Sequence, residues 1–231
     1  MNDTYTSPSV LVVSMTTRDA DLLSRSEAII RKQAGHGAMA VSCHWGSPRI
    51  LVAVSAQRSR AGSLELADSA TRLLHAAGLT QPEDRPEQNV FHHRFDTPDS
   101  GHQPPMIHVS VPASFGVELM LLAGAALRPL ADRRVLFAGL CGPIDSSLRN
   151  LFDTAGIDAL TRFANQLPKH RIDGLYPLFF LIGALGGVAR GVLDHVVTDR
   201  ASTVSSRRHQ TRAPHRAGAG VTFPLSANPM V

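Results

Sequence analysis

The sequence predicts an α/β fold built on a mixed sheet, with a helix-rich C-terminal half. Three observations lead to this prediction. Short runs of β-branched and other apolar residues alternate with segments whose apolar residues recur at helical spacing. The composition, 43% hydrophobic and 18% charged, is that of a globular protein rather than a disordered one. The length of 231 residues fits one domain, or one domain with an appendage.

The opening half, to about residue 96, predicts the element order β-α-β-β-α-β. A strand at residues 10–15 leads into a helix that Thr17 would cap and that carries Arg31 and Lys32 in its last turn. Ser63 would cap the second helix. The other three strands are expected at residues 39–45, 49–56 and 90–96. This order is typical of a ferredoxin-like sheet with its helices on one face.

The closing half is richer in helix. We expect strands at residues 106–111 and 134–138. Ser114 would cap an apolar helix at residues 117–127 that ends near Pro129, and Pro143 would be the first residue of the next helix. A short segment at residues 157–167 and an apolar stretch at residues 174–189 follow.

The last segment, residues 200–231, differs in charge from the rest of the chain. It holds no acidic residue and five arginines, which are Arg200, Arg207, Arg208, Arg212 and Arg216, whereas the whole chain has a net charge of +4. The body at residues 1–199 is therefore close to neutral, which argues against a nucleic-acid-binding body. We expect one α/β body, with a subdivision near residues 97–105 as an alternative, and a disordered basic tail. Through charge alone, the tail could contact nucleic acid or an anionic membrane.

The apolar stretch at residues 174–189 contains no charged residue. A membrane span needs about 20 such residues, so a buried helix or hairpin is the better interpretation. Gly183, Gly187 and Gly191 recur at four-residue spacing and would give a helix a flat face for close packing. Peripheral membrane contact through this stretch and the tail arginines is the alternative.

The stretch from residue 106 to residue 163 reads as a strand, a turn with a serine, an apolar helix, a second strand, a glycine-containing turn and a helix. Its letters are VPASFGVELMLL at the first turn and RRVLFAGLCGPIDSSLRNLFDTAGIDAL at the second strand and helix. This order resembles the second half of a STAS domain, the fold of bacterial anti-sigma-factor antagonists and of sulfate-transporter tails. The chain departs from the family's turn motif at Ala113 and Phe115, where the family has an acidic residue and a serine.

The resemblance implies a cytosolic regulatory module in which Ser114 occupies the phosphorylated position. A phosphate there would add nearly two negative charges at a helix N-terminus and would block a partner surface. The residue also permits a simpler role, because serine is a preferred helix cap.

The turn that holds Gly139, Cys141 and Gly142 lies between a predicted strand and a predicted helix. A thiol at a helix N-terminus has a lowered pKa and is more nucleophilic, and backbone N–H groups of such a turn can bind an anion or an oxyanion. The spacing matches neither a nucleophile elbow nor a phosphate-binding loop. Cys141 is therefore a candidate catalytic residue, and Gly139 and Gly142 a candidate anion-binding turn. A small buried cysteine is the alternative.

The eleven histidines raise the question of a metal site. Adjacent residues on a strand point to opposite faces, so an adjacent pair does not chelate one ion from regular β-structure. The adjacent pairs are Cys43-His44 and His92-His93, and the single histidines include His36, His75, His102 and His108. Without a zinc-binding spacing we predict no metal and no cofactor. Asp194 and His195 would form a triad with Ser114 only if the fold brought the three together.

These observations favour a cytoplasmic, non-enzymatic regulatory or scaffolding protein that acts through contact with another protein, with self-association as an alternative. The two cysteines lie far apart in the chain, which fits a reducing compartment. Two other functions stay open at this point. One is a small cysteine-dependent enzyme that uses Cys141, and the other is a peripheral membrane protein.

Overall fold

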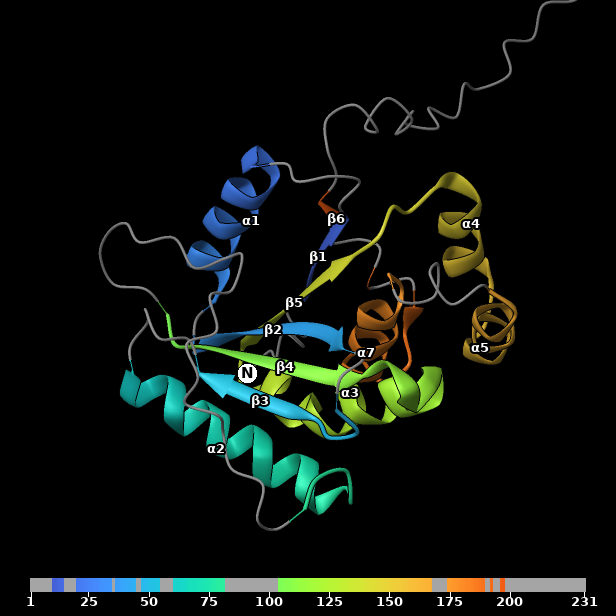
Figure 1. The fold of residues 1–231 in the computed structure, drawn as a ribbon. Coiled ribbons are helices and arrows are strands. Elements are labelled where there is room, and N and C mark those ends of the chain that lie inside the picture. Colours follow the sequence, from blue (N-terminus) through green and yellow to red (C-terminus); the bar gives the residue numbers. More distant parts are fainter. Residues whose placement is uncertain are drawn as a thin grey trace, which may run out of the picture.

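The described residues form one six-stranded sheet. The computed structural model describes residues 10–14, 20–34, 36–44, 47–54, 60–81, 104–167, 174–189, 192 and 196–197. The strand order is β3-β4-β2-β5-β1-β6 (Figure 1). The strands are β1 (Val10–Ser14), β2 (Gly37–His44), β3 (Leu51–Val54), β4 (Met106–Pro112), β5 (Val135–Cys141) and β6 (Val196–Val197). All neighbouring strands pair in parallel except β3 and β4, which are antiparallel. The predicted α/β fold on a mixed sheet is confirmed.

The pairing of the strands differs from that of a ferredoxin-like sheet. Such a sheet is antiparallel, whereas here β4 lies between β2 and β3 and runs parallel to β2 from Ala38↔Met106 to His44↔Pro112. All of β4 and the first part of β2 are buried. Strands that are buried on both faces belong in the interior of a sheet, and the short strand β3 lies at the edge.

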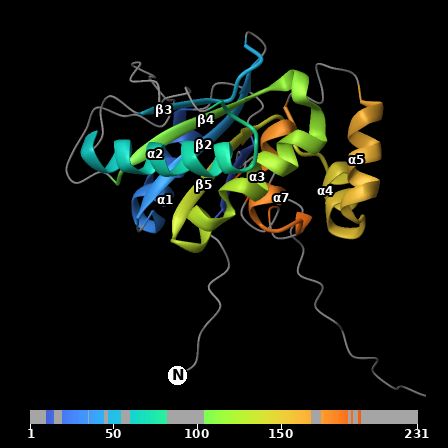
Figure 2. The same cartoon turned by 90° about the horizontal axis from the view of Figure 1, so that it is seen from below.

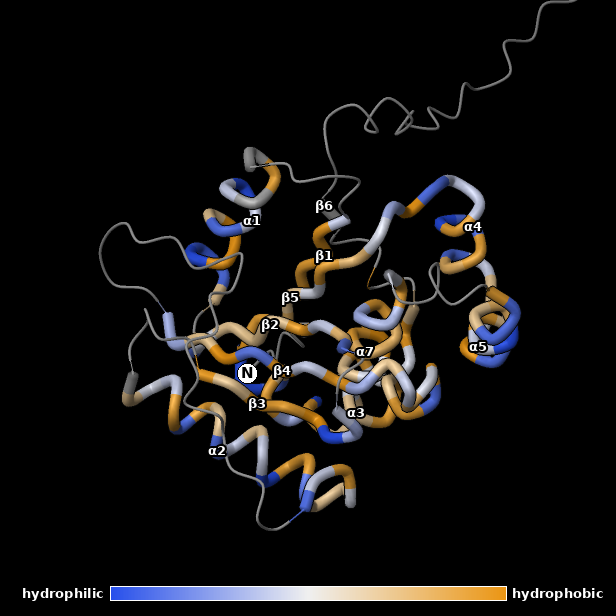
Figure 3. The backbone as a smooth tube through the Cα atoms, in the orientation of Figure 1, coloured by the Kyte–Doolittle hydropathy of each residue, from blue (hydrophilic) through white to orange (hydrophobic). Residues whose placement is uncertain are grey.

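Helices cover both faces of the sheet. On one face, α1 packs on the strands through Leu22, Ile30 and Ala34. On the opposite face lie α2, α3 and α7, and α4 and α5 stand together beyond α3 and α7 at one end of the molecule (Figure 2). Hydrophobic residues run along the strands between these layers (Figure 3). The helices are α1 (Ala20–Gln33), α2 (Arg60–Ala76), α3 (Gly116–Asp132), α4 (Ser146–Thr154), α5 (Ile157–Gln166) and α7 (Tyr176–Ala184), and the 3-10 turn η1 (Ala113–Phe115) precedes α3.

Helix α7 lies inside the second face, and all of its residues are buried. The ring of Phe180 lies 6.5 Å from that of Phe137 in β5, and the ring of Phe179 lies 6.1 Å from that of Phe152 in α4. The apolar stretch at residues 174–189 therefore contains a buried core helix, and α7 offers no free surface to a membrane.

Helix α3 packs beside α7, and two glycines set how closely the two helices cross. A Cβ on Gly124 would overlap the carbonyl oxygen of Phe180, and a Cβ on Gly183 would overlap the carbonyl oxygen of Leu121. The predicted glycine face is only partly correct. Gly183 makes this contact, but Gly187 has a φ of 88° and follows the end of α7. Gly191 lies outside the described residues.

Among the described residues, one helical segment, Ala113–Asp132, is long and apolar enough to cross a membrane by length and composition. Its most apolar window has a mean hydropathy of 1.3, and 39% of that window is buried inside the protein. The buried side includes Met120, Ala123 and Leu127, which belong to the core cluster. A core helix satisfies the same length and composition criteria, and α3 is such a helix in this fold.

Two helix boundaries differ from those expected from local signals. Ser63 lies inside α2, where its hydroxyl accepts a hydrogen bond from the N–H of Met106 at 3.0 Å instead of capping the helix. Pro129 lies in the last turn of α3, which continues to Asp132. Tertiary packing of the buried Leu127 and Leu130 outweighs the single hydrogen bond that a proline removes there. Thr17, the strand expected at residues 90–96 and the tail at residues 200–231 lie outside the described residues.

Candidate functional site

Two neighbouring parallel strands send the chain to opposite faces of the sheet. From the carboxyl end of β1 the chain passes to α1 on one face, and from the carboxyl end of β5 it passes to α4, α5 and α7 on the other. Where crossover connections diverge in this way, a crevice opens outside the strand ends, and open α/β sheets bind their ligands there. The carboxyl ends of β1 and β5 therefore mark the expected binding site of this fold.

Ser14, the last residue of β1, holds the turn that follows β5. Its hydroxyl donates a hydrogen bond to the carbonyl oxygen of Gly142 at 3.2 Å and accepts one from the N–H of Ile144 at 3.3 Å. The N–H of Gly142 in turn donates to the carbonyl oxygen of Gly174 at 2.9 Å. Three segments that are distant in the sequence are thus joined at the carboxyl ends of β1 and β5.

A pocket of about 600 Å³ opens beside this turn. Small-molecule sites have volumes of about 300–1,000 Å³ and are lined mostly by apolar side chains. The walls come from α4, α5 and the segments next to α5 and α7, and they are Leu148, Leu151, Phe163, Leu167 and Leu175. Gly142, Asp145 and Ser147 supply polar groups on the side of the turn. The described lining therefore suits a molecule with an apolar body and a polar end.

Asp145 fixes the start of α4 at the edge of the pocket. It has extended backbone angles, and its Oδ1 accepts a hydrogen bond from the N–H of Leu148 at 2.7 Å. This is the geometry of a helix N-cap, so α4 begins at Ser146 and the prediction that Pro143 starts the helix is wrong. The capping aspartate, rather than the proline, determines where the helix turns away from β5.

Cys141 does not have the activated thiol that the sequence suggested. Its side chain is buried, and its Sγ–H donates to the carbonyl oxygen of Val13 at 3.6 Å. Burial raises the pKa of the thiol from 9.0 to about 12, against smaller lowering effects of hydrogen bonds from Ser14 and the backbone. No helix dipole acts on it directly, because α4 begins only at Ser146. The prediction of a nucleophilic Cys141 is wrong.

The two glycines of the predicted anion-binding turn have structural roles. A Cβ on Gly139 would lie 2.9 Å from Cδ1 of Leu181, so this glycine allows α7 to pack against β5. The N–H of Gly142 is already used in the hydrogen bond to Gly174. Gly142 lines the pocket, but its N–H is not available to an anion.

Ser114 is exposed and lies within η1, just before α3. The N-cap position of α3 is Phe115, and no side chain makes a cap hydrogen bond there. The prediction that Ser114 caps the helix is therefore wrong. Its hydroxyl does face solvent next to the first turn of α3.

A second polar cluster lies on the other face of the sheet, where β2 and β4 run side by side. The Oγ of Ser42 lies 2.8 Å from Nε2 of His108 and donates to the Oγ of Ser110 at 3.1 Å. The Oγ of Ser110 lies 2.8 Å from Nδ1 of His44. His108 and Ser110 are each 5% exposed. We call these four residues the serine–histidine chain.

From the sequence, His44 and His108 are expected only as separate metal candidates, and the chain that joins them is not predicted. A signal was present, because Ser42 and His44, and likewise His108 and Ser110, are two residues apart on a strand and so point to one face. The register that brings Ser42 opposite Ser110 is a property of the sheet and is not visible in either strand alone.

Within the described part of the chain, no three His, Cys, Asp or Glu residues gather in a way that could hold a metal ion. His92, His93, His102, Asp194 and His195 lie outside it. Among the histidines, this result therefore concerns only those in the described residues, which are His36, His44, His75 and His108.

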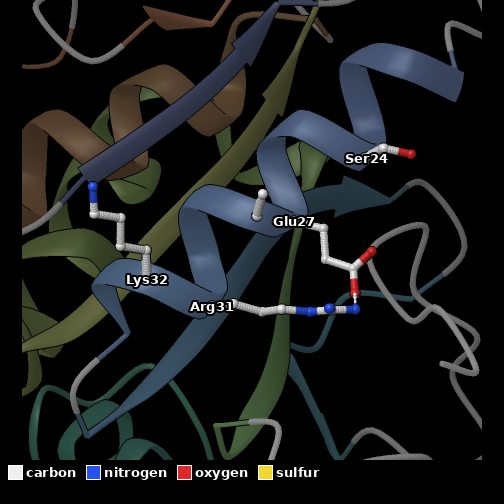
Figure 4. Close-up of a pocket in the computed structure, with 5 residues that line it drawn as sticks. Ser24, Glu27, Arg31 and Lys32 are labelled. Atoms are coloured by element: carbon white, nitrogen blue, oxygen red, sulfur yellow. Dashed lines mark hydrogen bonds and ion pairs between the residues drawn. The ribbon is translucent and has the colours of Figure 1, made fainter. Parts of the chain in front are cut away.

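A shallow hollow of about 510 Å³ lies on the outer surface of α1. Its described lining is Ser24, Glu27, Ala28, Arg31 and Lys32. Glu27 and Arg31 form an ion pair with an N–O distance of 2.7 Å. In Figure 4 a dashed line joins the two side chains, while Lys32 points away from them. The carboxylate of Glu27 is thus engaged within the helix, and the hollow does not present a group of polar side chains directed at a ligand.

Comparison with known proteins gives the fold and no function. No family model matches the chain, and no curated protein matches it. Among solved structures, the crystal structure of the uncharacterized protein JW3007 from Escherichia coli K12 is similar, with a TM-score of 0.53 and 16% sequence identity. The match covers 76% of this chain and 88% of that chain. At this identity the likeness shows a shared fold alone. The resemblance of residues 106–163 to a STAS domain stays a prediction.

Proposed function

We propose that the protein is a non-enzymatic regulatory protein that binds a small amphipathic molecule in the pocket beside Gly142 and acts through contact with another protein. The observation that carries the proposal is the pocket itself. It has the volume of a small-molecule site, apolar walls and polar groups on one side, and it lies at the strand ends where this class of fold binds ligands.

The chemistry of the described lining favours binding over catalysis. Cys141, the nearest candidate nucleophile in the sequence, is buried, and its thiol stays protonated at neutral pH because its pKa is raised to about 12. Asp145 already uses one carboxylate oxygen to cap α4. What remains is a hydrophobic cavity with a polar end, which holds a molecule without activating it.

The position of the pocket suggests how occupancy would reach a partner. Leu151 of α4 and Phe163 of α5 form walls that are only partly buried, whereas Leu175 before α7 is buried in the core. A bound molecule would therefore join the outer pair of helices to the core. It would change the surface that α4 and α5 present to another protein, or to a second copy of this one.

Binding can be tested with the neutral dye Nile red, whose fluorescence rises in an apolar site. We expect saturable binding of one dye per chain and its loss in Leu151→Trp, which fills the pocket. Leu122→Trp is the matched control, because Leu122 is 46% exposed on α3 and does not line the pocket. Dye binding that survives Leu151→Trp, or that Leu122→Trp reduces equally, contradicts the proposal.

A phosphorylation switch at Ser114 belongs to the same regulatory proposal. Its hydroxyl is exposed before the first turn of α3, so a kinase could reach it, and a phosphate would add charge at a helix N-terminus. Purified Ser114→Asp and Ser114→Ala chains should differ in the amount of a partner that they retain. Equal retention contradicts the switch.

The proposal also includes a cytoplasmic location and contacts of the basic tail at residues 200–231. Within the described structure, Cys43 and Cys141 form no disulfide, which supports a reducing, cytoplasmic compartment. Contact of the tail arginines Arg207, Arg208, Arg212 and Arg216 with nucleic acid or an anionic membrane would rest on charge alone. Such contact should disappear in high salt, as measured by filter binding or vesicle flotation.

A further inference from the structure

Helix α3 exposes an apolar stripe on its outer side. Leu122 is 46% exposed, and among the described residues only Val188 is another large apolar side chain of comparable exposure. Ala125 and Pro129 are also exposed and follow Leu122 at spacings of three and four residues, so the three share one side of the helix. A surface helix is usually polar on the side that faces water. An apolar stripe there indicates a surface for contact with another molecule.

Opposite charges lie at the two ends of this stripe. Glu118 precedes Leu122 by four residues, Arg128 follows Ala125 by three, and both charged residues are exposed. Within the described part of the chain, neither of the two side chains forms an ion pair. Arg128 lies at the edge of the stripe next to the end of α7, because a Cβ on Gly186 would overlap its guanidinium. Both charges are thus available to a partner.

The stripe is complementary to itself. A twofold dimer uses the same surface on both copies, so every contact of residue i with residue j is matched by the reciprocal contact. Glu118 and Arg128 lie five residues before and five residues after Ala123. Two α3 helices that run antiparallel across a twofold axis level with Ala123 therefore bring Glu118 of each copy level with Arg128 of the other. Leu122 lies next to this axis and within about 2 Å of the height of Ala125 of the other copy, because each residue rises about 1.5 Å along a helix.

Charge decides between this orientation and the parallel one. Two parallel α3 helices in a twofold dimer would bring Glu118 level with Glu118 and Arg128 level with Arg128. Like charges that face each other across an interface cost binding free energy, whereas the antiparallel arrangement gives two attractive pairs. In the antiparallel register Asp132 is level with the uncharged Ser114, so no acidic residue of α3 meets another.

We infer that the outer side of α3 is the contact surface of a homodimer in which two copies of this helix pack antiparallel. No residue of α3 belongs to the described lining of the pocket beside Gly142, and the surface differs from the one that α4 and α5 present. The dimer is therefore independent of ligand binding in the pocket, and either can fail without the other.

The size of the helix sets the expected strength of the dimer. Helix α3 has 17 residues, so it is about 25 Å long and about 10 Å wide. Its outer side covers roughly 250 Å² per copy, which is less than the about 800 Å² per partner of a standard interface. We therefore expect a weak, reversible dimer with a Kd on the order of 100 µM.

Sedimentation velocity of the full chain tests self-association at concentrations of about 5–500 µM, which bracket this Kd. We expect the sedimentation coefficient to rise with concentration toward that of a dimer. Leu122→Asp places a charge at the centre of the contact and should leave the chain monomeric across the range. A native chain that stays monomeric, or a Leu122→Asp chain that still dimerises, overturns the inference.

An exchange of charges tests the orientation of the two helices. Glu118→Arg and Arg128→Glu each bring like charges together in the antiparallel pair, so each variant alone should dimerise at least about tenfold more weakly than the native chain. An equimolar mixture of the two variants restores attraction at both pairs and should form a dimer as tight as the native one. Recovery in the mixture also shows that both variants fold.

The matched control is Glu65→Arg, which makes the same change in net charge as Glu118→Arg at an exposed position of α2. This variant should dimerise like the native chain. A dimer that Glu118→Arg does not weaken, or that Glu65→Arg weakens equally, does not use the outer side of α3 and overturns the inference. A mixture of the Glu118→Arg and Arg128→Glu chains that gives no dimer overturns the antiparallel arrangement.

Discussion

Replacing Gly124 in α3 by alanine would test how closely α3 crosses α7. The new Cβ would overlap the carbonyl oxygen of Phe180 and would lie 2.8 Å from its carbonyl carbon and 2.9 Å from the nitrogen of Ala184. These are backbone atoms, so no side-chain rotation can make room. Since carbon atoms in contact prefer separations of about 3.5–4.0 Å, the helices would have to move apart by roughly 1 Å.

The magnitude follows from two opposing effects. Overpacking of a core costs about 1–3 kcal/mol, and the upper end applies here because α7 is buried on all sides and held against Phe137 and Phe152. Replacing a glycine by alanine inside a helix stabilises the helix by about 1 kcal/mol. We expect Gly124→Ala to lower the free energy of unfolding by about 2 kcal/mol, which corresponds to a fall in Tm of roughly 4–8 °C.

The assay is urea unfolding followed by circular dichroism, with Gly156→Ala as the control. A Cβ on Gly156 would meet no heavy atom within 4 Å, and its φ of −71° suits any residue, so the change there should stay below about 1 kcal/mol. Gly183→Ala, the reciprocal contact, should behave like Gly124→Ala. The double variant should lose less than the two single losses combined, because one separation of the helices makes room for both methyl groups. A Gly124→Ala chain as stable as the native one would refute the close crossing.

Three further predictions concern single residues and use the same urea assay. Because the pKa of the buried Cys141 is about 12 against an ordinary 9.0, burial of the neutral thiol contributes stability that is complete below pH 9 and is lost as the pH rises toward 12. The native chain should therefore lose stability more steeply than Cys141→Ala between pH 9 and 11, and parallel curves would contradict the burial. Asp145→Ala should lower the free energy of unfolding by about 1 kcal/mol, because it removes the helix cap. Asp145→Asn keeps the hydrogen bond to Leu148 and should change this free energy by only a few tenths of a kcal/mol. Equal losses in the two variants would show that the cap has no role. Arg134 has a φ of 64°, so Arg134→Gly should raise the free energy of unfolding by about 1 kcal/mol, and a loss of stability would mean that its side chain makes a contact worth more than the strain.

The sequence by itself determined most of the local elements. Helix α7 follows from a continuous apolar run, and strand β4 follows from apolar residues that alternate with His108 and Ser110. The start of β5 was predicted to within one residue, but the strand continues to Cys141 instead of ending at residue 138. The polar turn residues between these runs separate the elements correctly. Such features depend on neighbours within a few positions, and a single sequence contains that information.

The tertiary structure alone decided the pairing and the environment of each functional candidate. The insertion of β4 between β2 and β3 depends on which apolar strands bury both faces, and this is a competition among distant segments. The thiol of Cys141 was predicted to be activated by a helix N-terminus, but Asp145 starts that helix later and leaves the thiol buried, with a raised pKa. The sites appear only when strands align, since the pocket needs β1 beside β5 and the serine–histidine chain needs Ser42 opposite Ser110. Hydrogen bonds and desolvation act over a few ångströms in space, between residues that the sequence separates by as many as 130 positions.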